Sequence, residues 1–316
     1  MTASPQHEPV MLREAVEGLA VRPGGRYVDA TVGPGGHAEA ILEAASPGGR
    51  LLGIDLDPDA LTAAGERLAR FGDAGELVHG NYRDVAELCE QHRFTPIDGV
   101  FFDLGVSSLQ LEAPGRGFSF QRDEPLDMRM DPTNELSAAE IVNEYEEQEL
   151  AKLIREYGEE RRARAIARTI VARRPIRSTG ELVSAVEQTV GKGRGRQIHP
   201  ATLTFQALRI AVNQELNNLV VALPAARGLL GGAGSRLVII AFHSLEDRTV
   251  KQYLRRESSD CICPPRLPIC VCGHTATLRL VTKRVRRPGE AELARNHRAR
   301  SARMRIAESI VEREAA

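Results

Sequence analysis

The sequence predicts an α/β fold, a parallel sheet interrupted by an all-helical insertion, and three observations predict it. Over the first hundred residues, short apolar runs alternate with helical periodicity, which is typical of βαβ units. After about Leu111 a Gly/Pro/Arg-rich connection leads into a long helical region. The apolar run 237–242 then resumes the sheet pattern. The core is expected in two parts, 1–112 and 213–316, and the second part includes a basic C-terminal segment. The helical insertion is expected between them, at 113–212.

The first four strands are expected at 26–30, 50–56, 76–79 and 97–104. A helix should lie between the second and third strands, since Asp57 can cap it and Pro58 suits its first turn. Its residues Leu61, Ala64 and Leu68 share one face, which should pack on the sheet.

The middle of the chain carries helix signals. The segments 137–140 (SAAE) and 178–181 (STGE) have the spacing of capping boxes, and Gly158 and Gly191 are typical of helix ends. The pattern of 200–223 predicts one long helix. A last strand is expected at 278–283, and the Arg-rich C-terminal segment is expected to be a helix or an ordered tail.

Composition excludes several classes of protein. The chain has 316 residues, 42% hydrophobic and 27% charged, which excludes collagen-like, fibrous and wholly disordered proteins. The longest apolar run has six residues, whereas a membrane-spanning helix needs about 20. The polar N-terminus does not have the pattern of a signal peptide. We therefore expect a cytoplasmic protein with no membrane partner.

The net charge of −1 conceals an uneven distribution. Residues 121–149 include ten acidic and two basic side chains, so this stretch should repel phosphates. Residues 251–316 include fifteen basic and seven acidic side chains, and 152–177 include nine basic and three acidic. A solvated helix face explains one such run taken alone, but two basic stretches in one chain favour contact with a polyanion.

A glycine-rich loop, 29–37 (DATVGPGGH), follows the first expected strand. Glycines at a strand-to-helix turn let a ligand approach the backbone closely. Gly33, Gly35 and Ala38 satisfy the dinucleotide pattern G-x-G-x-x-G/A. Asp55 ends the second strand about 20 residues further on, where an acid that binds a ribose is expected. A tight structural turn without a ligand is the alternative.

The acids around this loop favour one nucleotide over another. A nicotinamide cofactor brings a pyrophosphate, which needs N–H donors and no nearby anion. Pro34 removes a donor, and Asp29 adds an anion. S-adenosylmethionine has no phosphate and carries a sulfonium and an ammonium, so acidic residues suit it. Asp103 ends the fourth strand at the carboxyl edge, where it is expected to hold the ammonium or the target base, unless it only caps a loop.

The chain carries long motifs along nearly its whole length: 7–12 (HEPVML), 29–37 (DATVGPGGH), 53–58 (GIDLDP), 98–108 (DGVFFDLGVSS), 116–120 (RGFSF), 125–132 (PLDMRMDP), 157–161 (YGEER), 199–202 (HPAT), 204–209 (TFQALR) and 242–248 (FHSLEDR). Together they resemble the motifs of the RsmH (MraW) family of bacterial methyltransferases. The family transfers a methyl group from S-adenosylmethionine to N4 of a cytosine in the decoding region of 16S ribosomal RNA. The resemblance implies a Rossmann-like class I S-adenosylmethionine-dependent methyltransferase core with a helical insertion that recognises the substrate. It also implies the small ribosomal subunit as partner, and it leaves a homo-oligomer open.

By motif position, the resemblance implies seven cofactor contacts in this chain: Gly35, Gly36, His37, Asp55, Tyr82, Asp103 and Gln110. On physical grounds Tyr82 can stack on a purine, although a lone aromatic residue is more often part of a core. Gln110 can fix a polar edge of the cofactor, or it can be an exposed loop amide.

On the side of the target base, the candidate catalytic residue is His243, which follows the apolar run 237–242. It would orient the amine or relay its proton, and a structural histidine bonded to backbone is the alternative. Phosphate contacts are expected from Lys192, Arg194, Arg196 and the basic residues of 295–305. One departure from the family is His297, which stands where the family commonly has proline and which puts the local shape of that segment in doubt.

Cysteines form two C-x-C units, Cys261/Cys263 and Cys270/Cys272, while Cys89 is expected in the core. Four thiolates can bind zinc, but zinc fingers prefer a C-x2-C or longer spacing, so reduced thiols or a disulfide remain alternatives. No catalytic metal is expected, because methyl transfer from a sulfonium requires none.

Two competing functions are kept beside the methyltransferase. A nicotinamide-dependent oxidoreductase would share the glycine-rich loop, and Pro34 and Asp29 count against it. A noncatalytic RNA-binding protein would retain the core, and the intact loop with Asp55 and Asp103 counts against that.

Overall fold

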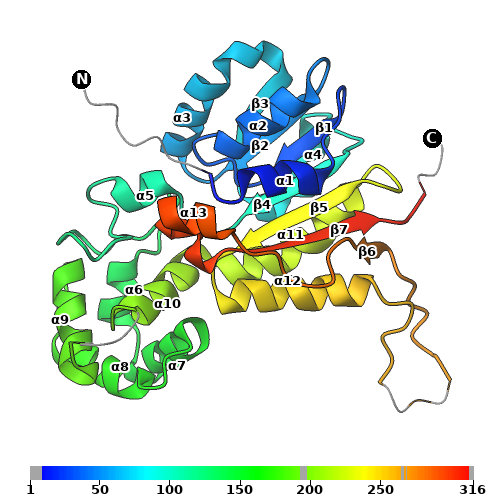
Figure 1. Cartoon of the computed structure of the whole chain (residues 1–316). Coiled ribbons are helices and arrows are strands. Elements are labelled where there is room, and N and C mark those ends of the chain that lie inside the picture. The colour runs from blue at the N-terminus through cyan, green and yellow to red at the C-terminus, as the bar shows by residue number, and fades with distance from the viewer. Residues whose placement is uncertain (1–8, 193–197, 265–266, 268, 313–316) are drawn as a thin grey trace. The chain divides into compact units, whose positions relative to one another are not determined.

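The computed structural model describes residues 9–192, 198–264, 267 and 269–312 (Figure 1). The chain divides into two compact units. One consists of Met1–Gly105 and Leu216–Ala316, and the other is the continuous stretch Val106–Glu215. The sequence prediction put the insertion at 113–212, inside that stretch.

The first unit is built on a sheet that has seven strands within the described residues, in the order β3-β2-β1-β4-β5-β7-β6. The pairs among β1 to β5 are parallel, and β7 is antiparallel to both β5 and β6. The strands are β1 Arg26–Asp29, β2 Arg50–Asp55, β3 Gly75–His79, β4 Gly99–Asp103, β5 Arg236–Ala241, β6 Leu278–Leu280 and β7 Arg303–Ser309.

Helices cover both faces of this sheet (Figure 1). On one face α1, α2 and α3 pack against Tyr27, Phe101 and Ile306. On the other face α4, α11 and α12 pack against Val28, Phe102 and other residues of the strands. The bounds are α1 Leu12–Leu19, α2 Gly36–Ala45, α3 Pro58–Leu68, α4 Val85–Gln91, α11 Glu215–Leu229, α12 Ser244–Glu257 and α13 Glu290–Arg295. Short 3-10 helices lie at Ala69–Ala74, Tyr82–Asp84 and His297–Ser301.

The register brings three strand ends to one edge. Asp29, the last residue of β1, is paired with Gly53 of β2 and with Phe101 of β4. Asp55 and Asp103 therefore each lie two residues further along their strands, at the carboxyl edge of the sheet. Ligands of open α/β sheets bind at this edge.

The second unit is helical: α5 Ser108–Glu112, α6 Ala138–Glu144, α7 Glu147–Gly158, α8 Ala163–Ala172, α9 Thr179–Val190 and α10 Thr202–Asn213. Fully buried side chains such as Ile154, Ile166 and Leu208 form its core. Gly158 permits a close approach of α7 to α10, because a Cβ there would lie 2.4 Å from the Leu203 carbonyl oxygen.

The helix signals in this unit have different outcomes. Ser137 and Glu140 form the predicted reciprocal capping box at α6. The Ser178 side chain accepts from the Glu181 N–H, but the Glu181 carboxylate accepts from the Arg177 N–H, so only half of that predicted box is present.

Two predictions about elements are wrong. The single helix expected at 200–223 is two helices, α10 and α11, because Gln214 adopts a left-handed conformation with φ 50°. The Arg-rich C-terminal segment, expected as a helix or tail, contains α13 and then β7, a strand inside the sheet. In addition, α11 continues through Pro224 to Leu229. None of the helices in the described residues is long and apolar enough to span a membrane.

Candidate active site

Asp55 connects the end of β2 to the glycine-rich loop. Its Oδ2 accepts a hydrogen bond from the Gly33 N–H at 2.8 Å, and its Oδ1 accepts from the Asp57 N–H at 2.9 Å. Burial raises the pKa of this carboxyl to about 6, although the two backbone donors oppose the rise. The side chain is therefore oriented before any ligand binds.

Asp29 and Asp103 each have a buried oxygen without a hydrogen-bond partner in the described part of the chain: Oδ2 of Asp29 and Oδ1 of Asp103. Thr31 forms one hydrogen bond with each of these residues. Its N–H donates to Asp29 Oδ1 at 3.2 Å, and its Oγ1 accepts from the Asp103 N–H at 2.7 Å. Leaving a buried carboxylate oxygen without a donor is costly, so this arrangement favours a ligand that donates hydrogen bonds.

The electrostatics of this edge select the charge of the ligand. Burial raises the pKa of Asp29 to about 7, and Asp55 adds to the rise. Burial also raises the pKa of Asp103 well above its usual range, and the charges of Asp29 and Glu246 raise it further. Clustered acids repel an anion such as a pyrophosphate and attract a cation. The site is suited to a ligand with a positive charge.

His37 lies beside Asp103 and is buried. Its Nε2 is 2.9 Å from the Val10 carbonyl oxygen and must donate there, which directs Nδ1 toward Asp103 Oδ2 at 3.6 Å. The next residue, Met11, donates its N–H to Oε1 of buried Glu292 on α13 at 2.7 Å. Glu292 thus fixes the segment that orients His37. Sequence reasoning missed it, because 281 positions separate it from Met11.

The glycines of the loop have packing reasons of their own. Gly35 has φ 82°, and a Cβ there would lie 3.2 Å from Ala64 Cα on α3. A Cβ on Gly36 would lie 2.4 Å from Pro9 Cγ. These positions let α2 begin close to α3 and to Pro9, so close packing explains both glycines independently of a ligand.

Tyr82 follows β3 in the short helix Tyr82–Asp84. Its ring meets the Phe102 ring edge-on, with centroids 5.9 Å apart, and it is partly buried against the core. The ring is only partly buried, so its contact with the core is compatible with the expected contact with a purine.

Gln110 lies in the helical unit, on α5. It is buried rather than an exposed loop amide, and its Oε1 accepts from the Ser107 N–H at 2.9 Å in a capping box. The structure therefore gives its amide oxygen a role in starting α5.

His243 caps α12. Its Nδ1 accepts from the Glu246 N–H at 3.4 Å, and its Nε2 lies 3.1 Å from Glu246 Oε1 without hydrogen-bond geometry. The other oxygen of Glu246 accepts from the Phe242 and His243 N–H groups, at 2.8 and 3.2 Å. The spacing His-x-x-Glu was a capping-box signal that the sequence analysis did not use.

The expected phosphate contacts fall into three groups. Lys192 is exposed, and Arg194 and Arg196 lie outside the described residues. In the 295–305 segment, Arg305 lies 2.7 Å and Arg303 3.6 Å from Asp247, and both belong to β7. For these two arginines phosphate contact stays a prediction, and both already lie beside an acid of α12. The exposed basic residues of the segment are Arg295, Arg298 and Arg300.

His297 does not distort the C-terminal segment. It is the first residue of the short helix His297–Ser301, whose cap is Asn296, with its side chain accepting from the Arg298 N–H at 3.2 Å. Proline suits a first helical position. A proline and a histidine can therefore occupy this position with the same backbone.

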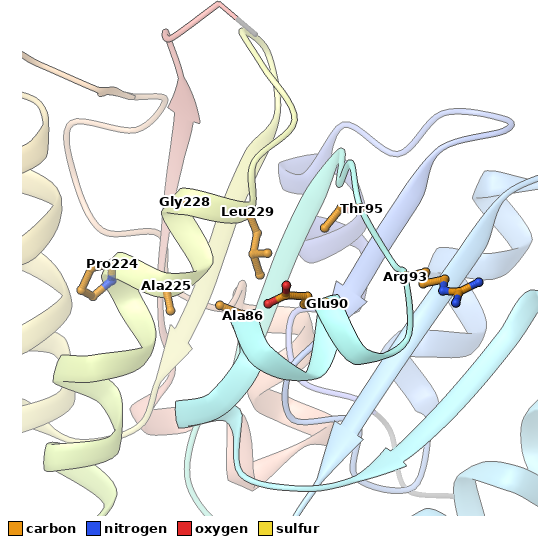
Figure 2. A pocket seen from close by; sticks show the side chains of 8 residues that line it. All are labelled: Ala86, Glu90, Arg93, Thr95, Pro224, Ala225, Gly228 and Leu229. Carbon is orange, nitrogen blue, oxygen red and sulfur yellow. The ribbon is translucent and has the colours of Figure 1, made fainter. Parts of the chain in front are cut away.

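A separate pocket of about 770 Å³ lies between α4 and α11 (Figure 2). It is lined by small and aliphatic side chains with Glu90 and Arg93, and none of the expected site residues contributes to it. The candidate site is therefore the group of acids at the strand ends, and not this pocket.

Comparison with known proteins gives a consistent result. A family model described as the MraW methylase family matches residues 4–310. Proteins named ribosomal RNA small subunit methyltransferase H are similar over nearly the full length. The one from Dehalococcoides mccartyi is 54% identical over 97% of this chain and 87% of its own, and the one from Thermomicrobium roseum is 55% identical over 97% and 94%. The one from Symbiobacterium thermophilum is 50% identical over 95% of each chain.

Proposed function

The chain belongs to the MraW methylase family and is an S-adenosylmethionine-dependent methyltransferase, and on that premise we propose that it methylates N4 of a cytosine in 16S ribosomal RNA. The relatives named as small-subunit ribosomal RNA methyltransferases support the RNA class. The oxidoreductase alternative is withdrawn, because the family match and the acid cluster both oppose it.

The observation that carries the proposal is the pair of unpartnered buried oxygens on Asp29 and Asp103. The ammonium of the methionine part brings three donors, and the sulfonium brings a second positive charge. This edge of the sheet lacks hydrogen-bond donors and positive charge. The cofactor supplies both, so the residues present fit it. S-adenosylmethionine supplies a methyl group that is electrophilic because its sulfur is cationic.

Each proposed contact has a distinct task. Asp103 would accept hydrogen bonds from the ammonium, and the Asp29 carboxylate would add negative charge nearby. The His37 ring would lie beside Asp103, with its Nδ1 3.6 Å from Asp103 Oδ2. Asp55 would accept from ribose hydroxyls, since each of its oxygens has a lone pair beyond the one used by Gly33 or Asp57. The remaining predicted contacts are Gly35 and Gly36 at the loop, Tyr82 beside the adenine, and Gln110.

On the nucleophile side, cytosine N4 is weak because its lone pair is delocalised into the ring. Alignment of the amine with the methyl group is therefore the main contribution asked of the protein, and it can supply about 7 to 11 kcal/mol. The target base must leave its stack to reach the site. His243 remains the candidate that orients the amine or takes its proton, and the Glu246 N–H donates to its Nδ1.

Binding of RNA is proposed to use exposed basic residues, among them Lys192, Arg298 and Arg300. Such contacts position a backbone without reading its sequence. The proposed substrate is the small ribosomal subunit, and the proposed location is therefore the cytoplasm.

The test is methyl transfer from labelled S-adenosylmethionine to small subunits from a strain lacking this protein, with the modified nucleoside identified. Asp103→Asn is measured in parallel, with Asp73→Asn, an exposed acid of the same unit, as the matched control. We expect the wild type and Asp73→Asn to form labelled N4-methylcytosine, and we expect Asp103→Asn to form much less of it.

Two further substrates sharpen the result. Subunits from the parent strain should accept no label, because their site is already modified. Free 16S RNA tests whether assembly is required. Label on another nucleoside, or no label from a chain that binds the cofactor, would contradict the proposed target.

A further inference from the structure

The segment between α12 and β6 gathers four cysteines that the methyl-transfer site does not use. The Sγ atoms of Cys261, Cys263, Cys270 and Cys272 all lie within 4.8 Å of one another. Two of the separations are 3.6 Å, between Cys270 and Cys272, and 3.9 Å, between Cys261 and Cys272. We propose that these four side chains form a structural zinc site.

The distances fit one tetrahedral ion. Zinc–thiolate bonds of about 2.3 Å in a tetrahedron put the sulfur atoms about 3.8 Å apart. Clusters of several irons with bridging sulfides would hold their cysteines further apart. The thiols are free in the structure, and none is paired in a disulfide. A single ion with four sulfur ligands accounts for the geometry.

Backbone N–H groups also point at the sulfurs. Cys263 donates its N–H to Cys261 Sγ, and Val271 donates to Cys263 Sγ, each at 3.4 Å. Ile262 donates to Cys272 Sγ at 3.4 Å. Such donors stabilise thiolates and orient metal-ligating side chains. The C-x-C turns thus present their sulfurs inward although the spacing is shorter than the usual C-x2-C.

Packing cannot hold this segment by itself. Ile269 and Val271 are 75% and 76% exposed, and Ile262 is 41% exposed, so its apolar side chains form no core. Its base is fixed to α12, where the Thr277 N–H donates to the Glu257 carbonyl oxygen at 2.8 Å. A metal would supply the missing stabilisation, as it does in small domains without a sufficient core.

The position argues for a structural ion rather than a catalytic one. α12 begins at the carboxyl edge of the sheet, after β5, and its 14 residues extend about 20 Å. Its end and the start of β6 lie at the opposite edge, since Leu278 pairs with Ser309 beside the Arg236 end of β5 (Figure 1). Four protein ligands also leave no open position for substrate.

The first measurement is the metal content of the full chain, purified under reducing conditions, by elemental mass spectrometry. We expect one zinc per chain in the wild type and in Cys89→Ala, a matched control that removes a buried thiol of the same unit. The double variant Cys270→Ser/Cys272→Ser should lose the zinc. Its far-ultraviolet circular dichroism checks that the rest of the chain stays folded.

The second measurement replaces zinc by cobalt in the wild type. We expect the visible absorption bands of tetrahedral cobalt with thiolate ligands, absent from the double variant. The proposal is overturned by a wild-type chain that is metal-free, by iron in place of zinc, by disulfides among the four cysteines under reducing conditions, or by equal zinc in the double variant.

Discussion

Two acids of the helical unit and two acids of the sheet unit are held in opposite ways. In the helical unit, buried Glu215 is 6% exposed and receives two hydrogen bonds of 2.8 Å from Arg209, and partly buried Asp127 receives bonds of 2.9 and 2.8 Å from Arg129. In the sheet unit, Asp29 and Asp103 have buried oxygens with no donor among the described residues. The first arrangement is complete, and the second is incomplete within the described residues.

The pKa directions express the same difference. Burial alone would raise the pKa of Asp127, but the hydrogen bonds and charge of Arg129 lower it below its usual value. For Asp103, burial is reinforced by Asp29 and Glu246, and the pKa rises. A buried acid with its own cation contributes to folding, whereas a buried acid among other acids is a candidate for function.

The largest expected effect comes from breaking the complete arrangement. Arg209→Leu leaves the Glu215 carboxylate buried without its cation and should lower the free energy of unfolding by about 3 kcal/mol. Chemical denaturation of the purified chain measures it. The double variant Arg209→Leu/Glu215→Leu should recover part of the loss, and an unchanged stability in the single variant would contradict the comparison.

The incomplete arrangement should respond in the reverse way. Asp103→Asn removes the carboxylate proposed to bind the ammonium, and we expect kcat/KM for methyl transfer to fall about 100-fold, which corresponds to about 2.7 kcal/mol. The same variant should be at least as stable as the wild type, because it removes an acid whose ionisation is opposed by burial and by Asp29 and Glu246. A variant that loses stability and activity together would make Asp103 a structural residue.

The pH dependence of stability should have opposite signs for Asp29 in the sheet unit and Asp127 in the helical unit. Because Asp29 titrates at about 7 and Asp55 at about 6, cofactor affinity should fall about tenfold as the pH is lowered from 7.5 to 6. Because folding raises the pKa of Asp29, its protonated form stabilises the ligand-free chain. This stabilisation is complete below the unfolded pKa of 3.8 and is lost as the pH rises through the folded pKa of about 7.

Asp127 has the opposite sign. Its lowered pKa contributes stability that is present above 3.8 and lost as the pH falls through its lower folded value. Calorimetric titration of S-adenosylmethionine between pH 6 and 7.5 and denaturation curves over a wider range test both signs. An affinity that is constant over that interval would exclude Asp29 from the binding site.

Much of the sheet unit could be predicted, because its strands are short apolar runs and helix α3 begins with the cap Asp57. Strand β7 was missed although 303–306 alternates, with an arginine before each of the buried residues Met304 and Ile306. The arginines were interpreted as a phosphate-binding surface, whereas two of them bind Asp247. No glycine or proline near Gln214 indicates the turn between α10 and α11 in the sequence.

The candidate site could be predicted where a rule links position to chemistry. Asp55 and Asp103 follow from strand ends, which meet at one edge of a parallel sheet. The orientation of His37 could not be predicted, because it depends on Val10 and on a contact from Met11 to Glu292 that only the folded chain brings together. Local patterns carry no information about such distant contacts.

Glu292 is an intermediate case between the two kinds of buried acid, and it gives the smallest expected effect. Its carboxylate is 8% exposed and accepts the Met11 N–H, a neutral donor. Glu292→Gln keeps an acceptor oxygen, so we expect a loss of about 1 kcal/mol in stability. Because His37 donates to Val10, the neighbour of Met11, KM for S-adenosylmethionine should rise about threefold, or about 0.7 kcal/mol, with kcat unchanged. Glu290→Gln, exposed on the same helix, is the control and should change neither quantity. If Glu292→Gln changes stability but not KM, then α13 supports the fold without positioning His37.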